Sequence, residues 1–210
     1  MQQVTTKNNC IEHGIILPDS FWERAESYRE LVEKYNLSHG LMSLKELPNF
    51  YPRHLIDCLS PLLFLEFKDG ISILDYGSGG GFPGVVLALA LHKCKFLFVE
   101  SNQKKSAFLK ICKTELKIKN CWVHCDRAEI IKTKYNIVTI RATGPLEISI
   151  PRAINLLTEK GKLIVWVGPS SLSTVTTIAN TIPYSSCILY DYPPALIPNY
   201  NLKLFVISLD

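Results

Sequence analysis

Two spacings of apolar residues alternate along the chain from residue 71 onward. Short β-branched runs bounded by turn residues give way to stretches in which apolar residues recur every three or four positions. The short runs predict strands and the longer stretches predict helices. The expected strands cover residues 71–76, 95–100, 121–125, 135–140, 161–168, 187–190 and 202–207. The expected helices between them cover residues 83–91, 102–116, 149–157 and 172–180.

The order of these elements indicates the fold class. Strands that alternate with helices favour an α/β fold, with a mostly parallel sheet covered by helices on both faces. The connection from residue 191 to 201 is too short for a crossover helix, so we expect the last two strands to be antiparallel.

The first 60 residues follow a different pattern. Apolar residues between 22 and 35 recur at helical spacing, and Ser20 and Glu23 have the spacing of a capping box. The expected buried face of this helix consists of Trp22, Ala25, Tyr28, Leu31, Val32 and Tyr35. Pro52 favours the start of a further helix, over residues 52–59. We therefore expect an N-terminal helical cap over residues 1–60 and an α/β domain over residues 61–210.

Composition adds a cellular setting. The chain has 210 residues, of which 47% are apolar and 20% charged, as in a soluble globular protein. No apolar run approaches the roughly 18–20 residues that span a bilayer, and residues 1–13 have no signal-peptide core. We expect a cytoplasmic monomer with no membrane partner. The net charge of +4 is compatible with a polyanionic partner but does not require one.

The seven cysteines predict neither a disulfide framework nor a metal site. Their number is odd and their spacing is scattered, which favours reduced, buried thiols. Cys121, His124 and Cys125 are close in sequence, but no second ligand pair follows at the spacing of a zinc site. We expect no metal.

The most informative segment joins the strand at 71–76 to the helix at 83–91. Asp75 ends the strand, a glycine-rich turn follows, and Pro83 stands where the helix should begin. Glycines let a backbone approach a ligand closely, so the segment predicts a nucleotide-binding turn.

The turn can be aligned in two registers. Residues 79–84 satisfy the G-x-G-x-x-G pattern of dinucleotide-binding folds, but there the first glycine should directly follow the strand. The alternative register starts at Asp75 and places Gly77, Gly79 and Gly81 at every second position, as in S-adenosylmethionine (SAM) methyltransferases. Asp75 at the strand end favours SAM, and its carboxylate is expected to orient loop amides or the methionine amino group.

Two acidic positions support a nucleoside ligand. Glu100 ends the second expected strand, 19 residues beyond Gly81, where a carboxylate can accept hydrogen bonds from ribose hydroxyls. NAD enzymes use the same arrangement, so Glu100 does not choose between cofactors. Residues 126–129 follow the third strand, where Glu129 and exposed backbone can contact the adenine. Both carboxylates could instead be solvated loop residues.

With these residues in view, the chain resembles the bacterial 16S ribosomal RNA guanine-N7 methyltransferases, the RsmG or GidB family. The family's loop has the form D-V-G-T/S-G-x-G-F/L-P-G, and residues 75–84 match it through Phe82, Pro83 and Gly84. Four further segments resemble family motifs in the same order along the chain: Arg53–Cys58, Glu100–Leu109, Arg127–Glu129 and Ile140–Ala142.

The resemblance implies a class I methyltransferase fold, a Rossmann-like seven-stranded sheet whose last strand pair is antiparallel. It also implies SAM as cofactor and 16S rRNA or the small ribosomal subunit as partner. The residues implied to line the SAM pocket are Gly77, Phe82, Ala128, Glu129 and Arg141, with Glu100 on the ribose. Asp75, Ser78, Gly79 and Gly81 are expected beside them as part of the loop. Arg53 and His54 are the candidates for contact with RNA.

The chemistry fits this resemblance. Guanine N7 carries a free lone pair, so its methylation removes no proton and needs no general base; catalysis is alignment of N7, methyl and sulfur. We expect Arg141 to act at the reacting centre, because it ends the fourth strand and its guanidinium can hold the SAM carboxylate or an RNA phosphate. A structural salt bridge is the alternative for Arg141, and a structural hydrogen bond is the alternative for His54.

A lysine-rich helix follows Glu100. Its basic residues are Lys104, Lys105, Lys110, Lys113 and Lys117. They can contact RNA phosphates or simply form a solvated helix face.

Three positions depart from the family pattern, one of which is Cys58, where the family usually has serine. Gly40 stands where the family usually has asparagine, and Val167 stands where it usually has lysine at the end of the fifth strand. Three alternatives therefore stay open: a SAM-dependent methyltransferase of another RNA or of a small molecule, a non-catalytic SAM-binding module, and an NAD-dependent dehydrogenase.

Overall fold

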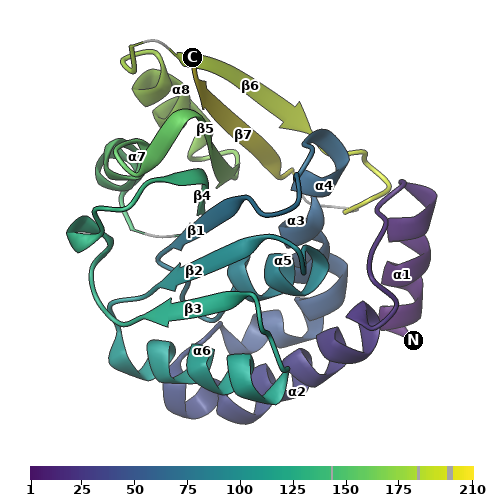
Figure 1. The fold of residues 1–210 in the computed structure, drawn as a ribbon. Coiled ribbons are helices and arrows are strands. Elements are labelled where there is room, and N and C mark those ends of the chain that lie inside the picture. Colours follow the sequence, from purple (N-terminus) through teal and green to yellow (C-terminus); the bar gives the residue numbers. More distant parts are fainter. Residues whose placement is uncertain (143, 184, 198–200) are drawn as a thin grey trace.

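The computed structural model describes residues 1–142, 144–183, 185–197 and 201–210 (Figure 1). The helices are α1 (Gln2–Glu12), α2 (Phe21–His39), α3 (Ile56–Leu59), α4 (Pro61–Phe64), α5 (Gly84–Ala90), α6 (Gln103–Glu115), α7 (Leu146–Ile154) and α8 (Leu172–Ala179). Short 3₁₀ helices cover Leu44–Asn49 (η1) and Ala128–Ile130 (η3), and a π-helix covers Phe50–Leu55 (η2). The strands are β1 (Ser72–Tyr76), β2 (Lys95–Val99), β3 (Cys121–His124), β4 (Tyr135–Ile140), β5 (Leu157–Val167), β6 (Ser185–Asp191) and β7 (Lys203–Leu209).

The strands form one sheet in the order β3-β2-β1-β4-β5-β7-β6. Strands β1 to β5 are parallel, whereas β7 runs antiparallel to both β5 and β6. The predicted α/β class, the seven strands and the antiparallel last pair are confirmed. The chain moves from β1 to β2 and β3 on one side and then returns to place β4 on the other side of β1. This reversal creates a switch point, where the carboxyl ends of β1 and β4 open a crevice that open α/β sheets use for ligands.

The two faces of the sheet carry different helices. Ile73 belongs to the apolar cluster beneath α2, α5 and α6, while the next residue, Leu74, belongs to the cluster beneath α7 and α8. This alternation follows from the period of two along a strand. All seven residues of α5 are buried, so the helix after the glycine turn is central to the first cluster.

The N-terminal helical segment shares a core with the sheet. Ala25, Tyr28 and Val32 on α2 are buried in the cluster that also holds α5, and Figure 1 shows α2 running beside α6. The predicted buried face is confirmed at these three positions, whereas Trp22, Leu31 and Tyr35 are partly exposed. The division of the chain at residue 60 stays a prediction.

Gly40 ends α2 in the left-handed conformation, with a φ of 60°. Glycine adopts this conformation without strain, and asparagine also tolerates it. The departure from the family pattern at this position is therefore compatible with the helix end.

Several expectations at element boundaries are wrong. Helix α1 was not expected, because its only buried residues, Thr6 and Cys10, give no apolar stripe. Ser20 precedes α2 as predicted, but its side chain makes no capping hydrogen bond. Helix α7 begins at Leu146 rather than 149 and holds Pro151 in its interior instead of its first turn. Strand β5 begins four residues early, at Leu157.

The described residues offer neither a membrane span nor a metal cluster. None of their helices combines the length and the hydropathy needed to cross a bilayer. No group of three or more His, Cys, Asp and Glu side chains among them could hold a metal ion. All seven cysteines are free thiols, and only Cys125 and Cys187 are exposed.

Candidate active site

The glycine turn lies at the switch point and depends on backbone conformations that favour glycine. Gly77, Gly79 and Gly81 have φ values of 68°, 54° and 96°. A Cβ atom on Gly81 would lie 2.6 Å from Cγ2 of Val85 and 2.8 Å from the hydroxyl oxygen of Tyr28. By contrast, a Cβ atom on Gly79 would meet nothing closer than 3.8 Å. Gly81 is therefore required for packing, whereas Gly79 faces open space.

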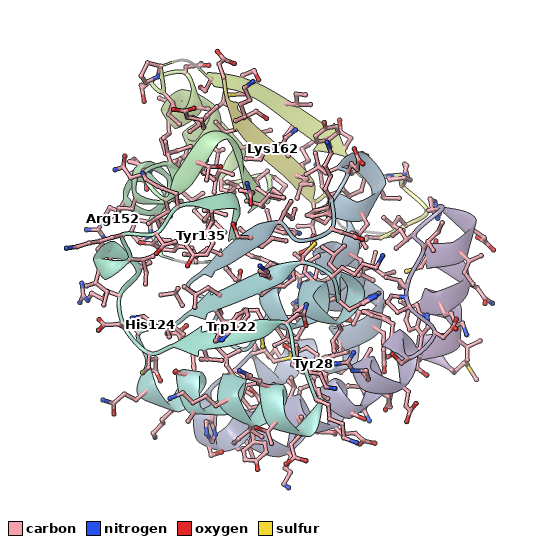
Figure 2. All side chains as sticks on the ribbon, viewed as in Figure 1. Tyr28, Trp122, His124, Tyr135, Arg152 and Lys162 are labelled. Carbon is pink, nitrogen blue, oxygen red and sulfur yellow. The ribbon has the colours of Figure 1, made fainter. Side chains whose placement is uncertain are left out.

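Tyr28 of α2 contacts the turn. Its buried hydroxyl donates a hydrogen bond to the backbone oxygen of Gly80 over 2.6 Å. Figure 2 labels Tyr28 on α2, far from β1 along the chain. Helical spacing predicted Tyr28 as a core residue but missed its contact with the turn, because nothing in the sequence links positions 28 and 80.

Asp75 is buried and holds the turn together. Its Oδ1 accepts a hydrogen bond from the Thr139 hydroxyl over 2.7 Å, and its Oδ2 accepts one from the backbone N–H of Gly84 over 3.2 Å. The hydroxyl of Ser78 donates to the backbone oxygen of Asp75 over 3.0 Å. Burial raises the pKa of the Asp75 carboxyl to about 6. Of the two roles expected for Asp75, the orientation of a loop amide is the one seen here.

Glu100 connects the turn to the end of β2. Its Oε2 accepts a hydrogen bond from the backbone N–H of Gly79 over 2.8 Å, and its Oε1 accepts one from that of Asn102 over 2.7 Å. Asn102 in turn caps α6, because its side-chain oxygen accepts from the N–H of Lys105. Each carboxylate oxygen has two acceptor sites, so Glu100 keeps capacity for ligand hydroxyls.

A cavity of about 160 Å³ lies at the end of β2, and its lining includes both chain neighbours of Glu100 but not Glu100 itself. Its walls are Tyr76, Gly77, Val99, Ser101 and residues 126–129. We call it the cofactor cavity. It brings together Gly77, Ala128 and Glu129, three of the predicted SAM-pocket residues. Glu129 also forms an ion pair with Arg152 of α7, which Figure 2 shows at the margin of the molecule.

A second cavity, of about 410 Å³, opens at the ends of β4 and β5, and we call it the target cavity. Its lining includes Arg53, His54, Asp57, Arg141, Trp166 and Val167. The predicted site residues therefore divide into two groups. Arg141 lies with the two candidate RNA-contacting residues, Arg53 and His54, whereas Gly77, Ala128 and Glu129 line the cofactor cavity.

Arg141 is held by two partners. Its Nε donates to Oδ2 of Asp57 over 2.8 Å, and its Nη2 lies 2.9 Å from Nδ1 of His54. The ion pair is largely buried, with the side chains of Arg141 and Asp57 exposed by 15% and 4%. The salt bridge considered as the alternative for Arg141 is thus present, and it leaves the Nη1 group without a bond to these partners.

His54 links Arg141 to Glu46. A guanidinium has no acceptor, so Nδ1 of His54 must accept and its proton must lie on Nε2. That nitrogen lies 2.8 Å from Oε2 of Glu46, to which Arg53 also donates over 2.6 Å. Burial and the charge of Arg141 lower the pKa of His54, which favours the neutral ring.

Asp57 is fixed by two further side chains. The Tyr192 hydroxyl donates to its Oδ1 over 2.9 Å, and the Trp166 indole donates to its backbone oxygen over 2.7 Å. The sequence indicated Asp57 only as part of the motif Arg53–Cys58. Glu46, Trp166 and Tyr192 gave no signal, because they come from distant segments and have no motif of their own.

Phe82 packs between Tyr28 of α2 and the residues of the target cavity. It is 8% exposed, and its ring centroid lies 5.3 Å from that of Tyr28 and 5.7 Å from that of His54. The guanidinium carbon of Arg141 lies 5.9 Å from the same ring. Phe82, which was predicted to line the SAM pocket, thus supports Arg141 and is not among the residues that line the cofactor cavity.

Comparison with known proteins yields a consistent set of relatives. The family model described as "rRNA small subunit methyltransferase G" matches residues 22–195. Proteins named ribosomal RNA small subunit methyltransferase G are similar to this chain: the one from Syntrophomonas wolfei is 32% identical over 75% of each chain. The one from Brachyspira hyodysenteriae is 36% identical over 75% of this chain and 76% of its own. The one from Nitrosococcus oceani is 30% identical over 83% of this chain and 88% of its own.

Solved structures share the fold at low identity. An rRNA methylase from Streptococcus thermophilus superposes with a TM-score of 0.54 at 14% identity, over 76% of this chain and 96% of that chain. TYW2 from M. jannaschii, solved in complex with AdoMet, gives a TM-score of 0.55 at 11% identity, over 80% of this chain and 76% of that chain.

Proposed function

This chain belongs to the rRNA small subunit methyltransferase G family, and we propose that it transfers the methyl group of SAM to N7 of a guanine in 16S rRNA. The single observation that carries the proposal is the site at the switch point. There Glu100 accepts a hydrogen bond from the glycine turn, Gly77 of the turn lines the cofactor cavity, and Arg141 lines the target cavity. The family match supports the substrate, and the antiparallel end of the sheet supports the methyltransferase fold.

The cofactor fits the first cavity in part. Whole-ligand pockets measure about 300–1,000 Å³, so a cavity of about 160 Å³ has room for one portion of SAM. We assign the adenosine end to it, with Ala128 and Glu129 beside the base and Glu100 accepting from the ribose. The turn at Gly77 and Gly79 would pass beside the remainder. When bound, SAM supplies an electrophilic methyl group on a sulfonium.

The side chains around the target cavity account for a reaction without a general base. Asp57 and Glu46 are each occupied by a cation, and His54 is held as the neutral ring between Arg141 and Glu46. None of these groups is free to accept a proton from a substrate. Guanine N7 needs no proton removed, so the transfer requires alignment rather than base catalysis.

Arg141 would supply that alignment. Asp57 and His54 use its Nε and one Nη2 hydrogen, which leaves the Nη1 pair for a carboxylate of SAM or a phosphate of RNA. The guanidinium approaches such an anion from a fixed orientation, so little conformational freedom is lost on binding. Val167 lines the target cavity without a charge, so the cations of the described lining are Arg141 and Arg53, which forms an ion pair with Glu46.

We further propose that the enzyme acts as a monomer, without a metal, in the cytoplasm, where rRNA is made and assembled. A reaction that needs no general base, carried out by one chain that holds both cavities, is compatible with a monomer that binds no metal.

The test is methyl transfer from labelled SAM to unmodified 16S rRNA, supplied either free or assembled into the small ribosomal subunit. We expect label at one guanine, and cleavage specific for N7-methylguanine should map it. Label elsewhere in the RNA, or in a small molecule, would point to another methyltransferase. SAM binding without transfer to either RNA would point to a binding module. Stronger thermal stabilisation by NADH than by SAM would point to a dehydrogenase.

A further inference from the structure

Among the described residues, no helix covers β2 and β3 on the side of the sheet where α7 and α8 lie. Helices α7 and α8 lie by β4 and β5, whereas β2 and β3 form the opposite end of the sheet (Figure 1). On the same side of the sheet as α7, β3 presents Trp122, which is 53% exposed. Figure 2 labels Trp122 and His124 on this strand.

The register makes this surface continuous with the cofactor cavity. His124 pairs with Val99, which lines that cavity, and Trp122 pairs with Leu97. Paired residues of neighbouring strands point to the same side of a sheet, so Leu97, Val99, Trp122 and His124 share one side. Trp122 lies about 7 Å, or two residues, further from the cavity than His124. With Lys95, which is exposed at the start of β2, Leu97, Trp122 and His124 form a surface that we call the β2–β3 face.

The charge around this face is positive. The Nζ of Lys113 lies 5.9 Å from the centroid of the Trp122 ring, a cation–π contact. Lys110 and Lys113 stand at i and i+3 on α6, so they share one flank of that helix, and Lys117 follows two residues after the helix ends. Neither 95–99 nor 121–125 contains a carboxylate. None of the ion pairs among the described residues involves Lys95 or these three lysines.

Exposed aromatic side chains bordered by cations are the means by which proteins hold single-stranded nucleic acid. The ring stacks on a base of any sequence, and the lysines neutralise phosphates. We propose that the β2–β3 face binds a single-stranded segment of the rRNA next to the target guanine, with one base stacked on Trp122. This inference rests on the proposed function, because it takes rRNA as the substrate.

An isolated exposed tryptophan would need no explanation by itself. Ile188 offers that comparison, because it is 49% exposed on β6, at the far end of the sheet from the cofactor cavity. No lysine lies in the strand that carries it, Ser185–Asp191. Trp122 differs in having a cation over its ring and a sheet surface that leads to the cavity.

The experiment compares W122A, W122F and I188A with the wild-type enzyme. Loss of a stacking ring weakens binding by about 5- to 150-fold, so W122A should raise the Kd and the KM for unmodified 16S rRNA by that factor. Its affinity for SAM and its kcat should not change, because Trp122 lies in neither cavity. W122F should recover most of the affinity, and I188A should match the wild type.

A second arm tests the lysines. Replacing Lys113 by alanine removes one phosphate neighbour, so the slope of log Kd against log salt concentration should fall by about 1. RNA binding should also quench the fluorescence of Trp122, so W122F should show less quenching than the wild type, and the signal that remains is that of Trp166, which lines the target cavity.

The outcomes separate the two proposals. A wild-type enzyme that transfers no methyl to 16S rRNA contradicts the proposed function. A wild-type enzyme that methylates the RNA, together with a W122A variant of unchanged RNA affinity, contradicts the β2–β3 face and leaves the proposed function intact. Equal weakening in W122A and I188A would also contradict it, because the effect would not depend on the face.

Discussion

The two cavities are built in different ways. The turn beside the cofactor cavity is made by one segment, residues 75–84, joined by Glu100, and its hydrogen bonds run mainly from backbone N–H groups to carboxylates. The target cavity is bordered by side chains that bond to one another: charged groups and the His54 ring from residues 46–57, Arg141 after β4, and the hydroxyl of Tyr192. One is local backbone geometry; the other is a network of side chains that only the folded chain brings together.

This difference decides how each region should respond to change. Every substitution except proline keeps the backbone donors, so the turn is sensitive chiefly to added atoms. The network around Asp57 consists of charges, so it is sensitive to the loss of a partner, which leaves a buried charge uncompensated.

The largest expected effect is on the turn. Gly79→Asp should abolish SAM binding, because the new carboxylate would stand beside Glu100, whose Oε2 accepts from the Gly79 N–H. Isothermal titration with SAM measures the loss. Gly79→Ala is the matched control, since a Cβ atom there meets nothing closer than 3.8 Å. Alanine carries only the strain of a positive φ, about 1–2 kcal/mol, and should keep measurable binding. Retained SAM affinity in Gly79→Asp would contradict the placement of the cofactor.

The next effect is on the network. Asp57→Ala should lower the free energy of unfolding by about 3–5 kcal/mol, because it leaves Arg141 buried without its carboxylate. Urea unfolding at neutral pH measures the change. Removing both charges in Asp57→Ala with Arg141→Met should restore part of the loss, although activity should stay absent. A loss as small as that of an exposed ion pair, about 0–1 kcal/mol, would show that the pair is not desolvated.

The fold could be predicted from the sequence where patterns are local. The alternation of strands and helices from residue 71, and the short connection before the last strand, were enough to give the sheet and its antiparallel end. Helix α1 was missed because an almost entirely polar helix has no stripe to detect. The start of β5 was missed because Glu159, Lys160 and Gly161 read as a turn, although the strand continues through them.

In the candidate site, too, some residues could be predicted from local patterns and others could not. Asp75, Gly77 and Glu100 could be predicted because strand ends and glycine spacing are visible in one dimension. The resemblance to the family indicated Arg141, but not that Asp57 and His54 hold it. Tyr192 lies 135 residues from Asp57 along the chain, and no periodicity connects them.

Asp75 gives the turn a pH dependence opposite in sign to that of His54 in the network, whose pKa is lowered by burial. Burial raises its pKa from 3.8 to about 6, so the folded state binds this proton more tightly than the unfolded state. The stabilising contribution is therefore complete below pH 4 and is lost as the pH rises through 6. The difference in unfolding free energy between the wild type and Asp75→Asn should fall by about 2.4 kcal/mol from pH 4 to pH 7. Urea unfolding across this range measures it, and a difference independent of pH would contradict an elevated pKa.

The smallest effect tests whether the turn is as local as it looks. Tyr28→Phe removes the hydroxyl that donates to the Gly80 oxygen but keeps the ring against Phe82. It should lower the unfolding free energy by about 1 kcal/mol and weaken SAM binding by less than about tenfold. Tyr51→Phe is the control, because its hydroxyl donates to Glu26 on the helical side. That variant should lose stability but keep its SAM affinity. If both variants bind SAM as the wild type does, the turn holds its shape without the hydrogen bond from Tyr28 of α2. The geometry of the cofactor side is then set without this contact from the helical segment.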